Sequence, residues 1–170
     1  MAIVDFDTEC WNDPWVQKLQ PLAKLLFVYL WTNVHRNISG IYVITPETIS
    51  FETGLTRDQV DALWPCLEPK VRYDPECSLC WVVKHARRQF LRSGKLSPKL
   101  RAGIRKHVWK FRWHPFSEAF AQIYPEIFTP QEVEVFAKAD TKSDSMDTLS
   151  ILLDTSGGKG KGGGSFLFKQ

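Results

Sequence analysis

The sequence has no apolar stretch long enough to cross a membrane. A spanning helix needs roughly 18 consecutive apolar residues, and the longest run here, from Leu25 to Trp31, has seven. Residues 1–7 are acidic and lack the charged-then-apolar layout of a secretory signal. We therefore expect a cytoplasmic protein with no membrane partner, whose 4 cysteines are thiols or metal ligands rather than disulfides.

Acidic residues are absent from one long segment. Residues 84–113 contain eleven Lys and Arg and no Asp or Glu, although the net charge of the whole chain is only +3. A helix face that merely meets solvent normally carries acids that pair with basic residues one turn away. A run of one sign favours a polyanionic partner instead, and nucleic acid is the usual one. The segment therefore predicts nucleic-acid binding.

The first 92 residues have the element order of a winged helix-turn-helix. A first helix should begin near Pro21, with apolar residues at helical spacing on its buried face: Leu22, Leu25, Leu26, Tyr29 and Leu30. A strand at 41–44 and a helix at 46–53 should follow. Gly54 separates that helix from the next, which Pro65 should end or kink near Leu63.

Two strand-like runs, 71–73 and 79–83, flank the turn residues Asp74-Pro75 and predict the hairpin that forms the wing. Beyond it, residues 84–92 favour a helix, and further helices should start at Ser97-Pro98 and at His114. The first of these further helices has an apolar stripe at Leu100, Ile104, Val108 and Phe111, and the second one at Phe116, Phe120 and Ile123.

From Thr129 the helical periodicity is lost, and residues 138–164 are rich in Ser, Thr, Asp, Lys and Gly. The expected fold is mainly α with a small β-hairpin. It consists of a winged helix-turn-helix domain at 1–92, a basic helical extension at 93–128 and a disordered tail at 129–170.

Several short motifs resemble the winged-helix N-terminal domains of bacteriophage replication initiation proteins, the replisome organizers similar to replication protein O. The resemblance covers about residues 11–125. Its motifs are Trp11-x-Asp13-Pro14, Leu19, Pro21, Lys24-Leu25-Leu26-Phe27, Tyr29-Leu30-Trp31, Gly40-Ile41-Tyr42, Thr48-Ile49, Glu52-Thr53-Gly54-Leu55, Val71-Arg72-Tyr73-Asp74, Trp81-Val82, Ser97-Pro98-Lys99 and Tyr124-Pro125.

This resemblance implies a protein that binds origin DNA in a bacterial or phage-infected cell, with the replicative helicase or its loader as a further partner. The sequence predicts no second folded domain after Pro125, and this departure weakens the expectation of helicase recruitment. A preference for duplex or single-stranded DNA and the formation of a homo-oligomer stay open. A transcriptional regulator of the same fold and a protein–protein adaptor that uses charge only for solubility are the alternatives.

Two groups of residues are candidates for DNA contact. In the third helix Arg57 and Gln59 can read guanine and adenine, but Asp58 and Asp61 repel phosphates, so a solvated or partner-facing surface is an equal interpretation. The basic segment is the stronger candidate. Its expected DNA-binding residues are Lys84, Arg87, Arg88, Arg92, Lys99, Arg101, Arg105, Lys106, Trp109, Lys110 and Arg112.

Trp109 and Trp113 lie among these basic residues and suit stacking on unpaired bases. The alternative, which we favour for at least one of the two, is packing against the last helix or another subunit.

Metal binding and catalysis find little support in the sequence. Cys77-x-x-Cys80, with Cys66 and His85, offers four zinc-ligand types, but the irregular spacing disfavours a zinc site. The basic segment has no carboxylate to hold a catalytic metal next to a phosphate. We therefore expect a non-enzymatic protein without a cofactor.

Overall fold

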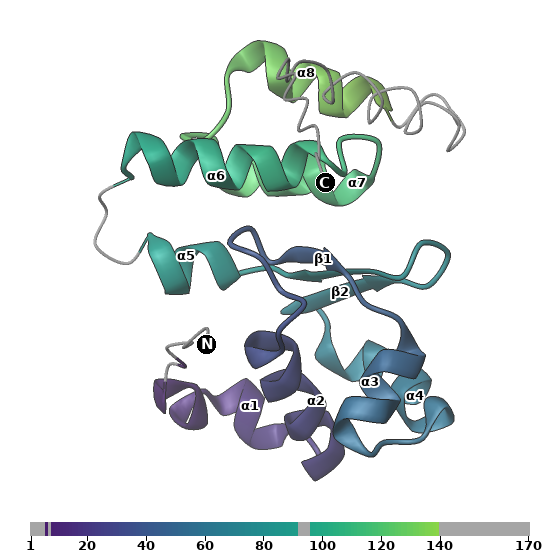
Figure 1. Cartoon of the computed structure of the whole chain (residues 1–170). Coiled ribbons are helices and arrows are strands. Elements are labelled where there is room, and N and C mark those ends of the chain that lie inside the picture. The colour runs from purple at the N-terminus through teal and green to yellow at the C-terminus, as the bar shows by residue number, and fades with distance from the viewer. Residues whose placement is uncertain (1–5, 7, 92–95, 140–170) are drawn as a thin grey trace, which may run out of the picture. The chain divides into compact units, whose positions relative to one another are not determined.

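The computed structural model of the chain describes residue 6, residues 8–91 and residues 96–139. These residues form one 3-10 helix, eight α-helices and three β-strands (Figure 1). In chain order they are η1 (Thr8–Asn12), α1 (Pro14–Lys18), α2 (Pro21–Thr32), β1 (Ile41–Val43), α3 (Pro46–Thr53), α4 (Arg57–Leu67), β2 (Val71–Asp74), β3 (Leu79–Val82), α5 (His85–Phe90), α6 (Pro98–Trp109), α7 (Pro115–Ile123) and α8 (Pro130–Ala139).

The expectation of a mainly helical protein with a small β-structure is confirmed. None of the helices in the described ranges combines the length and the apolar composition that crossing a membrane requires.

Local sequence signals set the ends of α3 and α4. Thr45 begins α3 because its Oγ1 accepts a hydrogen bond from the backbone N–H of Thr48, at 3.2 Å. Gly54 ends α3 in the left-handed conformation at φ +76°, which a residue without Cβ adopts without strain. Thr56 and Gln59 then form a capping box that starts α4. These boundaries agree with those expected from the sequence.

Pro65 does not end α4 where the sequence predicts. The helix continues to Leu67, with Pro65 in its last turn. A proline removes one backbone hydrogen bond and crowds the preceding turn. Because Leu67 is fully buried in the core beside Val60, packing holds the last turn in helical conformation in spite of that loss.

The buried face of α2 agrees with the expected one at Leu26 and Leu30, but Leu22 and Leu25 are exposed. The helix α1 packs on a neighbouring side, where the rings of Trp15 and Phe27 have their centroids 5.3 Å apart. The core thus contains Ala23, Phe27 and Trp31 in addition to Leu26 and Leu30, which were expected there.

The hairpin is part of a three-stranded antiparallel sheet in the order β1-β3-β2. Every residue of the central strand β3 is buried, so both faces of the sheet are covered. Figure 1 shows α1–α4 on one side of the sheet and α6–α8 on the other. Tyr42, Cys80 and Val82 join the core on the α2–α4 side. Ile41, Leu79 and Trp81 join a second core with α6, α7 and α8.

The predicted extension is therefore a helical layer on the sheet. The α6 stripe faces this second core, with Ile104 and Val108 fully buried. Gly103 allows close approach, because a Cβ added there would lie 2.7 Å from Cδ1 of Ile38. In α7, Phe120 is buried with its ring centroid 6.1 Å from that of Trp81. Ile123, expected on the same apolar face, is exposed.

Residues 130–139 form α8, although the sequence predicts a disordered tail from residue 129. Thr129 and Glu132 make the reciprocal hydrogen bonds of a capping box. Phe136 then buries its ring beside Phe128, with centroids 5.3 Å apart. These contacts give the helix a start and an anchor. Residues 140–170 of the predicted tail lie outside the described residues.

Candidate nucleic-acid interface

The exposed face of α6 carries a stripe of lysines. Ser97 caps the helix by accepting a hydrogen bond from the backbone N–H of Leu100, at 3.2 Å. The residues Lys99, Lys106 and Lys110 are exposed and lie within about 40° of one another around the helix axis at 3.6 residues per turn. We call these three residues the lysine face of α6.

No carboxylate neutralises the lysine face within the described part of the chain. Lys99, Lys106 and Lys110 form no ion pair among those residues, and neither does the exposed Arg101. The packing of Ile104 and Val108 into the second core turns the opposite side of α6 inward. The lysines therefore project into solvent from a helix with a fixed orientation on the sheet.

Other members of the basic segment are engaged within the protein. Arg105 is ion-paired with Glu132 of α8, so its charge is largely compensated. Arg112 places its guanidinium 5.8 Å from the ring centroid of Trp109. Trp109 itself packs on Phe136 at 5.5 Å and keeps 36% of its surface exposed. The last helix that the sequence predicts begins at His114, whereas the ring contact of Trp109 is with Phe136 of α8, a helix that the sequence does not predict.

Trp113 lies at the turn before α7 and is also partly exposed. The ring of His114 meets it edge-on at 5.3 Å. The two tryptophans therefore present part of their rings to solvent, and neither one stands free of protein contacts.

The residues expected to read bases on α4 are held by local contacts. Arg57 is ion-paired with Glu47 of α3, and its Nε lies 3.8 Å from Oδ2 of Asp61. Gln59 uses its side-chain oxygen to accept a hydrogen bond from the backbone N–H of Thr56, at 2.9 Å. Both side chains would have to leave these partners to reach a base edge. α4 is thus a poorer candidate for DNA contact than α6.

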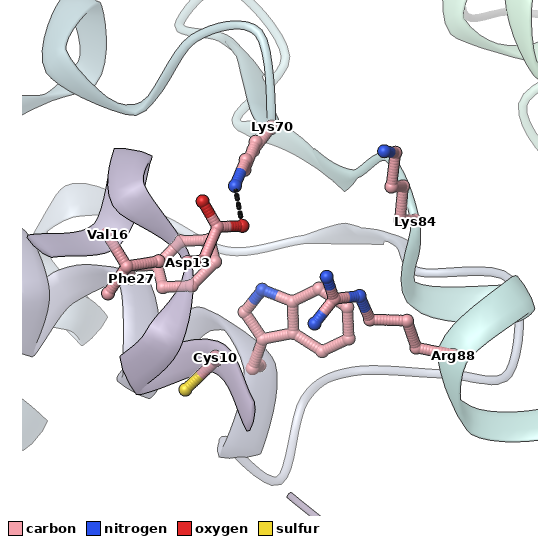
Figure 2. A pocket seen from close by; sticks show the side chains of 8 residues that line it. Cys10, Asp13, Val16, Phe27, Lys70, Lys84 and Arg88 are labelled. Carbon is pink, nitrogen blue, oxygen red and sulfur yellow. Dashed lines mark hydrogen bonds and ion pairs between the residues drawn. The ribbon is translucent and has the colours of Figure 1, made fainter. Parts of the chain in front are cut away.

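The basic residues around α5 lie on a different part of the surface. Lys84 and Arg87 are exposed, and the guanidinium of Arg87 lies 5.6 Å from the ring centroid of Tyr124. Lys84 and Arg88 line a pocket together with Lys70 (Figure 2). Arg92 lies outside the described residues.

The four zinc-ligand candidates are not brought together. Cys66 is exposed on α4, whereas Cys80 and His85 are buried. Among the described residues, the group whose metal-binding atoms lie close together is instead Asp74, Cys77 and His114, within 4.8 Å of one another. Sequence reasoning missed this group because His114 lies 40 residues from Asp74 along the chain.

Hydrogen bonds show what this group does. Nδ1 of His114 accepts from the backbone N–H of Phe116 at 3.1 Å, so the proton of the neutral ring sits on Nε2, which lies 2.8 Å from Oδ2 of Asp74. A metal on Nε2 would move that proton to Nδ1 and break the bond to Phe116. The arrangement therefore favours a structural link between the hairpin and α7.

The electrostatics of Asp74 agree with that link. Burial acts to raise the pKa of Asp74, but hydrogen bonds from His114 and from the backbone N–H of Glu76 outweigh it, and the pKa is lowered. The carboxylate is thus held in its charged form as the acceptor for the histidine.

No protein-family model matches the chain, no curated protein matches it, and no solved structure matches it.

Proposed function

We propose that this chain binds DNA, with the lysine face of α6 as its main contact surface and Lys84 and Arg87 as further contacts. The observation that carries the proposal is the exposure of Lys99, Lys106 and Lys110 on one side of a packed helix, inside a segment without a single acid. Phosphates are the natural partners of such a surface, and their neutralisation releases counterions from the DNA.

The fold that we propose for the N-terminal part is a winged helix-turn-helix. The order α2, β1, α3, α4, β2, β3 supports it, with α3 and α4 as the helix pair and the β2–β3 hairpin as the wing. In this chain the wing strands also carry the second helical layer, which presents the lysine face. DNA contact thus shifts from the recognition helix to α6.

The biological role that we propose is phage-type replication initiation at an origin, with the replicative helicase or its loader as a protein partner. The motif resemblance over residues 11–125 supports this role. Because Arg57 and Gln59 on α4 are held by contacts within the protein, contact with the DNA backbone is favoured over the reading of base edges. This suits a protein that marks or opens DNA and relies on another factor to select the DNA sequence.

The test compares two triple variants with the same change of charge. The first replaces Lys99, Lys106 and Lys110 by Gln, and the control replaces Lys18, Lys24 and Lys138, which lie outside the basic segment. Fluorescence anisotropy with labelled duplex and single-stranded oligonucleotides is recorded across a salt series. The log–log salt slope should flatten by about 2–3 in the first variant, at about 0.9 per lost phosphate contact. In the control it should stay close to that of the parent.

Equal effects of the two triples would show that only net charge matters and would overturn the lysine face as the contact surface. No binding by the parent at low salt would favour the protein–protein adaptor instead. Footprinting on phage DNA then separates the remaining roles, because protection of an origin supports initiation and protection of a promoter supports a transcriptional regulator.

A further inference from the structure

A small pocket lies beside α1, α2 and α5, away from the lysine face. Figure 2 shows that the ammonium groups of Lys70 and Lys84 and the guanidinium of Arg88 approach it from different parts of the chain. Lys70 precedes β2, Lys84 follows β3, and Arg88 belongs to α5. The fold thus collects three basic side chains around one cavity, although Lys70 lies outside the basic segment to which Lys84 and Arg88 belong.

The single acid in the lining is already compensated. Oδ1 of Asp13 accepts a hydrogen bond from the backbone N–H of Trp15 at 2.9 Å, and Oδ2 pairs with the ammonium of Lys70. The hydrogen bond from Lys70 lowers the pKa of Asp13, so the carboxylate stays charged and bound to that lysine. The exposed Lys84, which makes no ion pair with any described residue, adds a positive charge at the same cavity.

The pocket also contains an unused hydrogen-bond donor. Trp31 lines it, is 6% exposed, and its indole N–H has no acceptor among the described residues. A buried N–H without an acceptor is costly, so an oxygen atom that enters and accepts from it is favoured. Positive charge and an unsatisfied donor in one cavity select for an anion with oxygen atoms.

The volume of the cavity limits which ligands can enter it. Its volume is about 30 Å³, and since roughly 10–15 Å³ is enough for one water, it accepts one or two oxygen atoms and excludes a base or a sugar. We propose that this pocket binds a phosphate group through one or two of the phosphate oxygen atoms, with Lys84, Lys70 and the indole N–H of Trp31 as the donors. The phosphate belongs either to a nucleic-acid backbone or to a free phosphate compound.

The indole N–H of Trp31 is the reporter for the test. In a ¹H–¹⁵N spectrum of the full chain, Trp31→Phe identifies its signal, and inorganic phosphate is titrated against chloride at constant ionic strength. Phosphate should move the Trp31 signal saturably, and chloride should leave it in place. An unmoved signal, or an equal shift with chloride, would overturn the proposal.

Two substitutions in the pocket should act in opposite directions. Lys84→Gln should weaken phosphate binding by about tenfold, since one hydrogen bond from a charged donor is lost. Asp13→Asn keeps a good cap for α1 but removes the negative charge, so it should strengthen binding severalfold. Lys18→Gln is the matched control, because Lys18 is exposed and belongs neither to the lining of the pocket nor to the lysine face, and it should leave the phosphate affinity measured at Trp31 unchanged. Equal effects of Lys84→Gln and Lys18→Gln would contradict a defined pocket.

A short thymidine oligonucleotide distinguishes the two phosphate sources. If it moves the Trp31 signal in the parent and not in Lys84→Gln, the ligand is a nucleic-acid backbone; if only inorganic phosphate acts, it is a free phosphate compound. The triple variant of the lysine face should still bind inorganic phosphate. Loss of DNA binding and loss of the pocket can therefore be observed separately.

Discussion

The guanidinium of Arg105 on α6 is ion-paired with the carboxylate of Glu132 on α8, with Nε 3.1 Å from Oε1. The other oxygen of Glu132 accepts a hydrogen bond from the backbone N–H of Thr129 at 2.8 Å. Burial acts to raise the pKa of Glu132, but the Thr129 and Arg105 interactions outweigh it, and the pKa is lowered. One charged side chain thus both starts α8 and holds it against α6.

Glu132→Ala should therefore destabilise the protein by more than an ordinary surface substitution. The change removes half of a capping box and one ion pair, which together contribute about 1–2 kcal/mol. Urea unfolding followed by circular dichroism measures the difference. Glu134→Ala is the control on the same helix, because Glu134 is exposed and only 3.9 Å from Lys138 in an i,i+4 pair, worth about 0.3–0.5 kcal/mol. Similar losses in both variants would contradict the role of Glu132.

The ion pair between Arg105 and Glu132 should make Arg105 and its neighbour Lys106 differ in their contribution to DNA binding. Lys106→Gln should flatten the log–log salt slope by about 0.9, the value for one phosphate contact. Arg105→Gln should change the slope much less, because Glu132 already compensates the charge of Arg105. Anisotropy titrations of the two single variants across a salt series test this difference. A larger slope change for Arg105→Gln would show that Arg105 leaves Glu132 and contacts DNA.

Phe136 should be essential for α8 and for the second core. Its ring is 2% exposed and contacts Phe128 and Trp109 with centroid distances of 5.3 and 5.5 Å. Phe136→Ala should lower the free energy of unfolding by about 3–5 kcal/mol, as for other buried Phe to Ala changes. The exposed neighbour Val135 is the control, and Val135→Ala should change the free energy of unfolding by less than about 0.5 kcal/mol. A chemical denaturation series gives both values.

The features that local sequence signals determine could be predicted. Thr45, Gly54 and Ser97 mark helix ends through their own backbone neighbours, and the stripe of Ile104 and Val108 follows from helical periodicity. The residues Thr129-Pro130-Gln131-Glu132 have the pattern of a capping box and could equally have predicted α8, but the polar composition that follows them favours a disordered tail.

The features that depend on distant partners could not be predicted. Arg105 and Glu132 are 27 residues apart, and Lys70 meets Asp13 across 57 residues. By charge alone, Arg105 and Lys106 are equal candidates for DNA contact. Only the tertiary contact of Arg105 with Glu132 shows that the two residues differ. The pairing of β1 with β3, which makes a two-sided sheet out of the expected hairpin, is non-local in the same way.

A buried histidine should make the stability of the protein depend on pH. His85 is fully buried beside Trp31, at 5.4 Å between ring centroids. Burial, and then the positive charge of Arg36, lowers the pKa of His85 from 6.5 to about 4. Between these two values the unfolded chain binds a proton that the folded chain does not, so the free energy of unfolding should fall as the pH is lowered through this window.

The difference between the two pKa values of His85 corresponds to about 3 kcal/mol in the free energy of unfolding, at 1.36 kcal/mol per pH unit. Urea unfolding of the parent and of His85→Phe at several pH values isolates the contribution of His85. Acidic groups with lowered pKa values contribute equally to the pH dependence of both proteins, and they do so chiefly below pH 4.5. The parent should lose more stability than the variant between pH 6.5 and 4.5. An NMR titration of the His85 ring in the parent provides a measurement that needs no variant. A ring that takes up its proton near pH 6.5 in the folded protein would contradict the prediction.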